Sequence, residues 1–192
     1  MLQALGNELF ICHLKIKKKP HLYVYENSAG YKYAVDNSYS YTLIQNKNIT
    51  GVSLENATYT YDGMEKNLAV KGTLPAGAKV EYTNEKATNA GTYNAIAKII
   101  CEGYNDLVLS ATLKINPAEI TVRANDKQMV KGGAIPKLDY AIIGELYGND
   151  KITGELKVNT DGKTVGDFDI TQGTLAVSSN YKLTFEKGKL SV

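Results

Sequence analysis

The sequence predicts an all-β protein, in which two small tandem β-sandwich modules follow a tyrosine-rich leader that folds as a β-meander. Three observations support this fold class. Apolar residues alternate with polar residues in short runs, which is typical of half-buried strands. Glycine and proline turn sequences separate these runs. No stretch keeps the apolar spacing of an amphipathic helix over three turns.

The composition is that of an ordinary globular protein and excludes several classes of partner. The 192 residues carry a formal net charge of only +2, which does not indicate a nucleic-acid partner. Nearly all of the basic residues are lysines, and Arg123 is the only arginine, the residue type that best binds phosphate. No apolar run approaches the roughly 18 residues that a membrane-spanning helix needs. We therefore expect neither nucleic-acid binding nor membrane insertion.

The leader, residues 1–50, is the basic part of the chain and also has a tyrosine periodicity. Its excess charge is centred on Lys15, Lys17, Lys18 and Lys19, which we interpret as a solvated strand end or loop. Tyr-x-Tyr pairs recur every eight residues, and both members of a pair lie on one face of a strand. The tyrosines either stiffen the sheet by cross-strand pairing or form an aromatic platform for a ligand. On the second interpretation the ligand-binding residues are Tyr23, Tyr25, Tyr31, Tyr33, Tyr39 and Tyr41.

The clearest strands follow the leader. Apolar residues occupy every second position between Tyr93 and Ile99, and again between Leu107 and Ile115. The turn sequences Asp62-Gly63 and Pro75-Ala76-Gly77 precede them. Short strands between frequent turns favour a sandwich or small barrel over alternating strands and helices.

Two parts of the chain carry matching motifs in the same order, which indicates an internal repeat. Residues 89–93 and 164–168 each place a glycine two positions before an aromatic residue. Further along, Tyr104 and Tyr181 each lead a closing strand with apolar residues nine and eleven positions later. Those apolar residues are Leu113 and Ile115 in the first copy, and Leu190 and Val192 in the second.

The boundary between the repeats falls at Pro117. Proline lacks an N–H group and fixes φ, so it suits a stiff joint between strands. The leader then covers residues 1–50, the first repeat 51–116 and the second 117–192. Because the chain stops where the first repeat ended, we expect it to be a piece of a longer protein. In the second repeat the apolar parity changes near the end, which predicts a bulge or tight turn at Lys187-Gly188.

Residues with catalytic or metal-binding chemistry do not form a recognisable pattern. His13 and His21 are the only histidines, and Cys12 and His13 would point to opposite faces of a strand. We expect Cys12 and Cys101 to be free thiols. The sequence 157–168 matches the middle of a calcium loop but lacks its two strongest ligands. We therefore predict that the protein is not an enzyme and has no catalytic residue, no cofactor and no metal site.

The quoted motifs resemble the YDG/MBG-type repeats that occur in tandem in large bacterial cell-surface proteins. The first repeat has Tyr61-Asp62-Gly63, residues 72–77 and 89–93, and the closing segment 113–118. The second repeat is similar to a sister type, although Lys131-Gly132-Gly133 stands where a Tyr-Gly turn is expected. The resemblance covers about residues 51–192, and the leader matches no family.

The resemblance implies compact Ig-like or related modules, located outside the cell at the bacterial surface, that act in adhesion or as spacers. It implies no catalytic residues, and its motif residues are structural. These structural residues are Tyr61, Asp62, Gly63, Pro75, Gly77, Gly91, Tyr104, Pro117, Gly166 and Tyr181. The expected partners are neighbouring repeats of the same chain.

Three functions fit the sequence. The first is a non-enzymatic structural or spacer segment of a bacterial surface adhesin, built from semi-rigid tandem β modules. The second is a module that binds a host glycan, mucin or matrix protein through the leader tyrosines. The third is an intracellular protein-interaction domain, because the first residues do not have the pattern of a secretory signal peptide.

Overall fold

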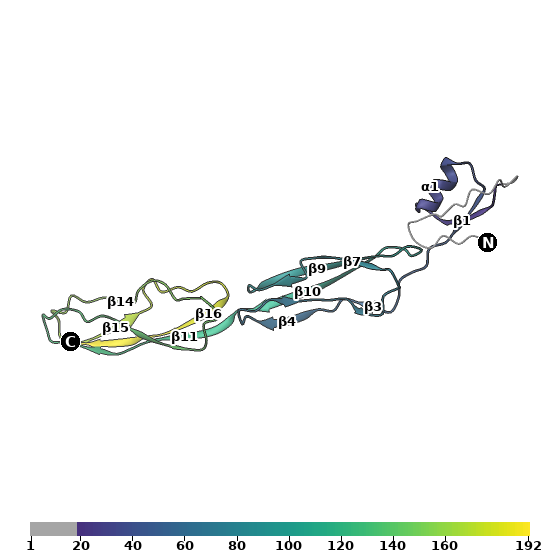
Figure 1. The fold of residues 1–192 in the computed structure, drawn as a ribbon. Helices are drawn as coiled ribbons and strands as arrows, with labels where there is room; N and C mark the ends of the chain where they lie inside the picture. The colour runs from purple at the N-terminus through teal and green to yellow at the C-terminus, as the bar shows by residue number, and fades with distance from the viewer. Residues whose placement is uncertain (1–18) are drawn as a thin grey trace. The chain divides into compact units, whose positions relative to one another are not determined.

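The computed structural model describes residues 19–192, which form an almost entirely β structure with one helix (Figure 1). The predicted all-β fold of the β-sandwich type is confirmed. The described chain packs as two compact units. The first contains residues 19–55, 69–83 and 96–111, and the second contains residues 56–68, 84–95 and 112–192. The units divide the chain by packing, and the sequence boundaries at residues 50 and 116 stay predictions.

The elements follow one another in short steps along the chain. Up to Asn116 they are β1 (Leu22–Tyr25), α1 (Ala29–Asp36), β2 (Tyr41–Ile44), β3 (Val52–Ser53), β4 (Ala57–Thr60), β5 (Lys66–Asn67), β6 (Lys71–Gly72), β7 (Lys79–Thr83), β8 (Lys86–Ala87), β9 (Gly91–Ile100) and β10 (Leu107–Asn116). After Pro117 they are β11 (Ala118–Ala124), β12 (Lys127–Gln128), β13 (Tyr140–Ile143), β14 (Lys157–Val158), β15 (Asp167–Thr171), β16 (Tyr181–Glu186) and β17 (Gly188–Ser191).

The described part of the leader is a small strand–helix–strand unit, so the predicted β-meander is wrong. Strands β1 and β2 pair in parallel, and α1 connects them, because parallel strands need a crossover rather than a tight turn. Ser28 caps the helix, with its Oγ accepting a hydrogen bond from the Tyr31 N–H at 3.1 Å. Ala34 is fully buried. At Gly30 an added Cβ would lie 3.3 Å from Val24 Cγ1, so the helix packs closely on β1.

Both repeats contain a four-stranded sheet, and the two sheets have the same strand order. The orders are β4-β10-β9-β7 and β12-β17-β15-β14. In each sheet the first strand pairs in parallel with the last, β4 with β10 and β12 with β17. The alternation predicted for the two long strands is confirmed by burial. Their most buried side chains are Ala95, Ala97, Ile99, Ala111, Leu113 and Ile115.

The second repeat adds a three-stranded sheet in the order β13-β11-β16. Strand β11 pairs in parallel with β16 over six residue pairs, from Ala118 with Tyr181 to Arg123 with Glu186. The chain then changes sheets at Lys187, because β17 pairs with β15 and β12 instead. The parity change at Lys187-Gly188, which predicted a bulge or tight turn, instead marks the transfer of one continuous segment between two sheets.

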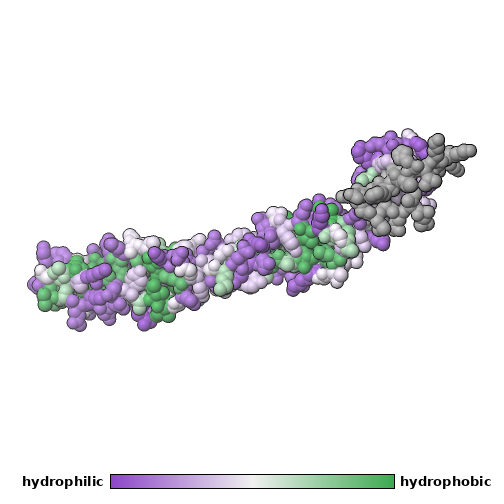
Figure 2. All heavy atoms as spheres, viewed as in Figure 1, coloured by the Kyte–Doolittle hydropathy of each residue, from purple (hydrophilic) through white to green (hydrophobic). Residues whose placement is uncertain are grey.

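Clusters of buried side chains form the cores of both units within residues 19–192. The first unit contains Ile49, Ile99 and Cys101. The second unit contains two clusters, one of Tyr61, Ile115, Ala118, Ile120 and Tyr181 and one of Ala124, Ile170 and Leu190. On the face shown in Figure 2, apolar residues gather around β3 and β7 and again around β14 and β15. Modules of this size bury a limited core, so each additional contact matters to stability.

Candidate functional site

Four of the six leader tyrosines pack against one another in two pairs. Tyr31 on α1 meets Tyr41 edge-on, with 5.3 Å between ring centroids and an interplanar angle of 90°. Tyr33 on α1 lies 5.5 Å from Tyr39 at 33°. A hydrogen bond with Tyr41 raises the pKa of Tyr31, and one with Tyr39 raises the pKa of Tyr33. The rings therefore pack between α1 and the segment that follows it, and not across strands.

The other two leader tyrosines lie in β1 and have different surroundings. Tyr23 is 57% exposed and meets the His21 ring edge-on at 5.3 Å. Tyr25 lies over Gly103 in the first unit, where an added Cβ would be 2.9 Å from its ring. Tyr23 is the leader tyrosine most available to a ligand, and ligand binding by the leader stays a prediction.

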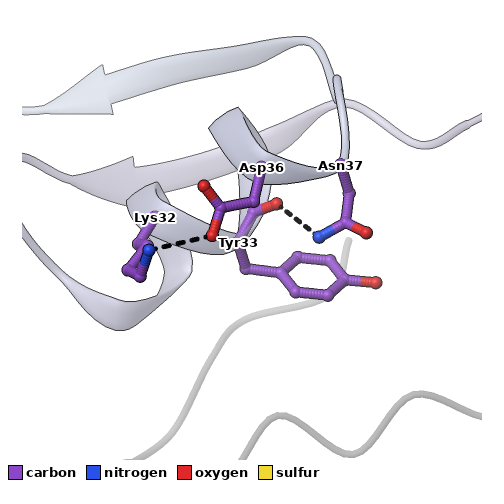
Figure 3. Close-up of polar contacts among 4 residues, drawn as sticks. All are labelled: Lys32, Tyr33, Asp36 and Asn37. Carbon is purple, nitrogen blue, oxygen red and sulfur yellow. Dashed lines mark hydrogen bonds and ion pairs between the residues drawn. The ribbon is translucent and has the colours of Figure 1, made fainter.

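The polar side chains on α1 complete the helix and do not converge on a reactive centre. Lys32 forms an ion pair with Asp36 one turn later at 3.0 Å, and Asn37 Nδ2 donates to the Tyr33 carbonyl at 3.0 Å (Figure 3). A shallow cleft beside them is lined by Asn27, Ser28, Tyr31, Lys32, Val35 and Asp36. Pairs of this kind hold an exposed helix together and leave no free catalytic group among them.

The most closely connected polar group of the described chain lies in the second unit, where the end of the first repeat meets the second. We call Tyr61, Asn89, Asp150, Asn180 and Tyr181 the joint. Asp150 Oδ2 accepts hydrogen bonds from the Tyr61 hydroxyl at 2.7 Å and the Tyr181 hydroxyl at 2.9 Å. The two rings meet edge-on, 5.3 Å apart at 81°. One carboxylate therefore links tyrosines from both repeats.

Asn180 provides the second connection at the joint. Its Oδ1 accepts from the Ala90 N–H at 2.8 Å, and its Nδ2 donates to Asn89 Oδ1 at 3.0 Å. Its backbone carbonyl accepts the Ala118 N–H at 2.9 Å, directly after Pro117. Asn180 is 8% exposed, so these partners replace water around a buried amide. The side chain binds both sides of the joint at once.

The electrostatics of the joint favour neutral tyrosines. The hydrogen bond to Asp150 and burial raise the pKa of Tyr61. Burial is the main cause that raises the pKa of Tyr181 to about 12. The Tyr181 hydroxyl also accepts the Tyr147 N–H at 2.7 Å. Both phenols are thus held as hydrogen-bond donors to a carboxylate and are unsuited to act as bases near neutral pH.

Turn residues support the joint from outside. Asp62 Oδ1 accepts the Met64 N–H at 2.9 Å, and an ion pair with Lys66 lowers the pKa of Asp62. Gly63 has a φ of +75°, and an added Cβ would lie 3.0 Å from Tyr147 Cβ. The Tyr-Asp-Gly sequence therefore forms a turn that packs against Tyr147, whose ring meets that of Tyr61 edge-on.

The remaining motif residues occupy structural positions. Gly77 has a φ of +81° in the turn that follows Pro75. Gly91 begins β9, and Gly166 exchanges two backbone hydrogen bonds with Val192. Tyr104 packs in the core of the first unit. Asp150, Asn89 and Asn180 were not among the predicted site residues. The signals in the sequence were the turn sequence Gly148-Asn149-Asp150 and the repeat motif at residues 89–93.

Chemistry of other kinds is sparse in the part of the chain that the structure describes. Within residues 19–192, no three histidine, cysteine, aspartate or glutamate side chains gather where they could hold a metal ion. Asp167 and Asp169, near the sequence that resembles part of a calcium loop, form ion pairs with Lys189 and Lys187. Cys101 is a buried free thiol. The predictions for Cys12, His13, Lys15, Lys17 and Lys18 lie outside the described residues.

No helix between residues 19 and 192 combines the length and the apolar character that crossing a membrane requires. A comparison with curated proteins found no match. Residues 120–191 match the family model of the MBG domain, YGX type. The match lies inside the second repeat, and it confirms the resemblance that the motifs of that repeat predicted. Residues 120–191 are therefore identified as an MBG-type repeat.

Proposed function

We propose that the chain is a non-enzymatic structural spacer segment of a bacterial surface adhesin, located outside the cell. The MBG-type repeat at residues 120–191 supports this proposal, because repeats of this type are typical of surface proteins. The joint supports it as well, since its side chains hold neighbouring elements together and offer no reactive group. The expected partners are neighbouring repeats of the same chain.

The observation that carries the proposal is the parallel pairing of β11, the first strand of the second repeat, with β16 near its end. Strands β11 and β16 pair in parallel over six residue pairs. When a chain is pulled through both ends of such a pair, the strands slide past each other and all the inter-strand hydrogen bonds resist together. Pulling both strands apart from the same end breaks the bonds one after another. This arrangement suits a segment that transmits tension along the chain.

Single-molecule pulling tests the proposal with two handle geometries on exposed residues. Glu119 pairs with Lys182 at one end of the ladder, and Glu186 lies at the other end. Cysteine handles at Glu119 and Glu186 load the strands in shear, whereas handles at Glu119 and Lys182 load them as a zipper. Both proteins carry Cys12→Ser and Cys101→Ala, so that only the handles react. We expect a clearly higher unfolding force in the shear geometry.

Equal unfolding forces in the two geometries would contradict a tension-bearing role for this repeat. The surface location has its own test, which is labelling of intact bacteria with an antibody against residues 117–192. We expect labelling without permeabilisation. Signal that requires permeabilised cells would support an intracellular interaction domain instead.

A second candidate function rests on the exposure of Tyr23. A half-exposed tyrosine beside His21 offers an aromatic face to which a sugar ring of a host glycan, a mucin or a matrix protein could bind. Tyr23→Ser should then abolish binding on a glycan array. Tyr82→Ser in the first repeat is the matched control, because Tyr82 is also exposed, at 37%. Unchanged binding in Tyr23→Ser excludes this site.

A further inference from the structure

The segment between β9 and β10 of the first repeat holds the leader by its backbone. Lys47 forms a parallel bridge with Tyr104, and its N–H donates to the Gly103 carbonyl at 2.9 Å. The Asn105 N–H donates back to the Lys47 carbonyl at 2.8 Å. A side-chain hydrogen bond is added by Asn105 Nδ2, which donates to Asn48 Oδ1 at 2.8 Å. These residues all belong to the first unit, so the contact is part of one packed body.

The second repeat has an equivalent backbone contact within itself, directly after Pro117. Ala118 pairs in parallel with Tyr181, and its N–H donates to the Asn180 carbonyl at 2.9 Å. The distance and the pattern repeat those of Lys47 and Gly103. Each repeat therefore carries a docking socket, which we define as its leading tyrosine and the residue before it, Gly103-Tyr104 and Asn180-Tyr181.

The two sockets differ in the side chain before the tyrosine. Asn180 fills its socket with an amide that binds Ala90 N–H and Asn89 Oδ1. Gly103 has no side chain, and the ring of Tyr25 occupies the space, so that an added Cβ would lie 2.9 Å from Tyr25 Cζ. A ring and an amide cannot share one position. The socket residue and its occupant are therefore matched in each case.

We propose that the residue before the leading tyrosine selects which preceding segment docks on each repeat. Gly103 admits an aromatic ring, and Tyr25 of the leader supplies it. Asn180 requires a backbone N–H and a side-chain amide, and the end of the preceding repeat supplies both. The leader thus occupies on the first repeat the place that a preceding repeat occupies on the second. This inference goes beyond the spacer role and does not depend on it.

Cys101 provides a direct readout of docking at the first socket. The leader loop Tyr25–Ser28 and the segment 101–104 line the same narrow cleft together with Asn46. The Cys101 thiol is 7% exposed and lies 3.6 Å from the Ala76 carbonyl oxygen. Asn46 Oδ1 is buried without a hydrogen-bond partner among the described residues.

The test measures the rate at which a disulfide reagent labels Cys101 in the full chain with Cys12→Ser. Tyr25→Ala removes the ring, and Gly103→Asn fills the socket with the residue type that best tolerates its φ of +78°. We expect both variants to label about tenfold faster than the parent, a change typical of losing one well-packed contact. Tyr23→Ala, in the same strand, should label at the parent rate.

Amide exchange at Ile99 and Leu113 separates undocking from general unfolding, because both side chains are fully buried. Exchange there should stay at the parent rate in every variant. At the second socket, Asn180→Gly should speed exchange of the Ala90 N–H, which loses its acceptor. The proposal is overturned if both Tyr25→Ala and Gly103→Asn label at the parent rate. It is also overturned if Tyr23→Ala labels as fast as they do, or if amide exchange at Ile99 becomes faster.

Discussion

A single oxygen of Asp150 accepts hydrogen bonds from two buried tyrosines, and this is the strongest polar contact at the joint. Hydrogen bonds to a charged group stabilise more than neutral ones, by about 1.5–3 kcal/mol each. The pairing is also specific, because Tyr61 and Asp150 are 89 residues apart and belong to different repeats. The contact therefore fixes how the end of the first repeat meets the second.

Replacing Tyr61 by phenylalanine tests this contact with little change in packing. We expect Tyr61→Phe to lower the free energy of unfolding by about 1–2 kcal/mol, because one bond to a charged acceptor is lost. Urea denaturation followed by circular dichroism measures the change. Tyr59→Phe is the matched control, since Tyr59 is 38% exposed two residues earlier. If both variants shift the midpoint equally, the hydroxyl of Tyr61 contributes nothing specific.

The raised tyrosine pKa values predict that stability falls at alkaline pH. In the unfolded chain a tyrosine ionises near pH 10, whereas Tyr181 in the fold stays neutral until about pH 12. Between these values the unfolded state binds fewer protons than the folded state, so the free energy of unfolding decreases as pH rises. Urea midpoints at pH 9, 10 and 11 should show this loss.

The double variant Tyr61→Phe/Tyr181→Phe provides the control for that pH dependence. It removes the two phenols of the joint, whose pKa values are raised, so its midpoint should fall less steeply between pH 9 and 11 than that of the parent. The remaining tyrosines are common to both proteins. An identical slope in the two proteins would show that the joint does not titrate as described.

Sequence reasoning found some residues of the joint and missed others for a physical reason. Tyr61 and Tyr181 belong to local motifs with turn chemistry or fixed spacing, so they could be predicted as structural residues. Asp150 has no such pattern, because its role depends on the folding of a distant turn against both tyrosines. A carboxylate at Gly148-Asn149-Asp150 is indistinguishable in sequence from any solvated loop acid.

At the scale of elements, the long strands were predictable and the leader was not. Strands β9 and β10 each have ten residues in which buried and more exposed side chains alternate, and a pattern of this length rarely arises by chance. The leader tyrosines also alternate, but Tyr31 and Tyr33 lie on a helix of only eight residues. The signal for that helix was Ser28 followed by apolar positions at Tyr31, Ala34 and Val35, which is shorter than a pattern search accepts.

The transfer of the last strand between two sheets depends on Gly188. An added Cβ there would lie 2.7 Å from the Ala124 carbonyl oxygen, a backbone atom that cannot move freely. We expect Gly188→Ala to lower the free energy of unfolding by about 2–3 kcal/mol through overpacking. Thermal denaturation measures the change. The neighbouring Lys187→Ala, which loses only an exposed ion pair with Asp169, should stay within about 0.5 kcal/mol.

A substantial loss in Lys187→Ala, or none in Gly188→Ala, would contradict the close approach at the sheet transfer. The sequence indicated this position through a change of apolar parity alone. It could not show that the two halves of the segment belong to different sheets, because pairing partners are set by distant strands.

At the scale of the whole molecule, the second unit contains the entire second repeat together with residues 56–68, 84–95 and 112–116 of the first. The two repeats share this unit because they share a core, which consists of Tyr61, Ile115, Ala118, Ile120 and Tyr181. Pro117 is the only residue between β10 and β11. A repeat of limited size thus gains stability from its neighbour. We expect a segment built in this way to resist bending at the joint through burial and hydrogen bonding.

The most direct test of this account is nuclear magnetic resonance relaxation of backbone amides in the full chain. One group of amides comprises residues 56–68, 84–95 and 112–116, and the other comprises residues 118–191. If the joint is rigid, one rotational diffusion tensor fits both groups, and in Asp150→Ala the groups begin to separate. Separate tensors for the two groups in the parent protein would show that the repeats reorient independently, which would contradict a rigid joint.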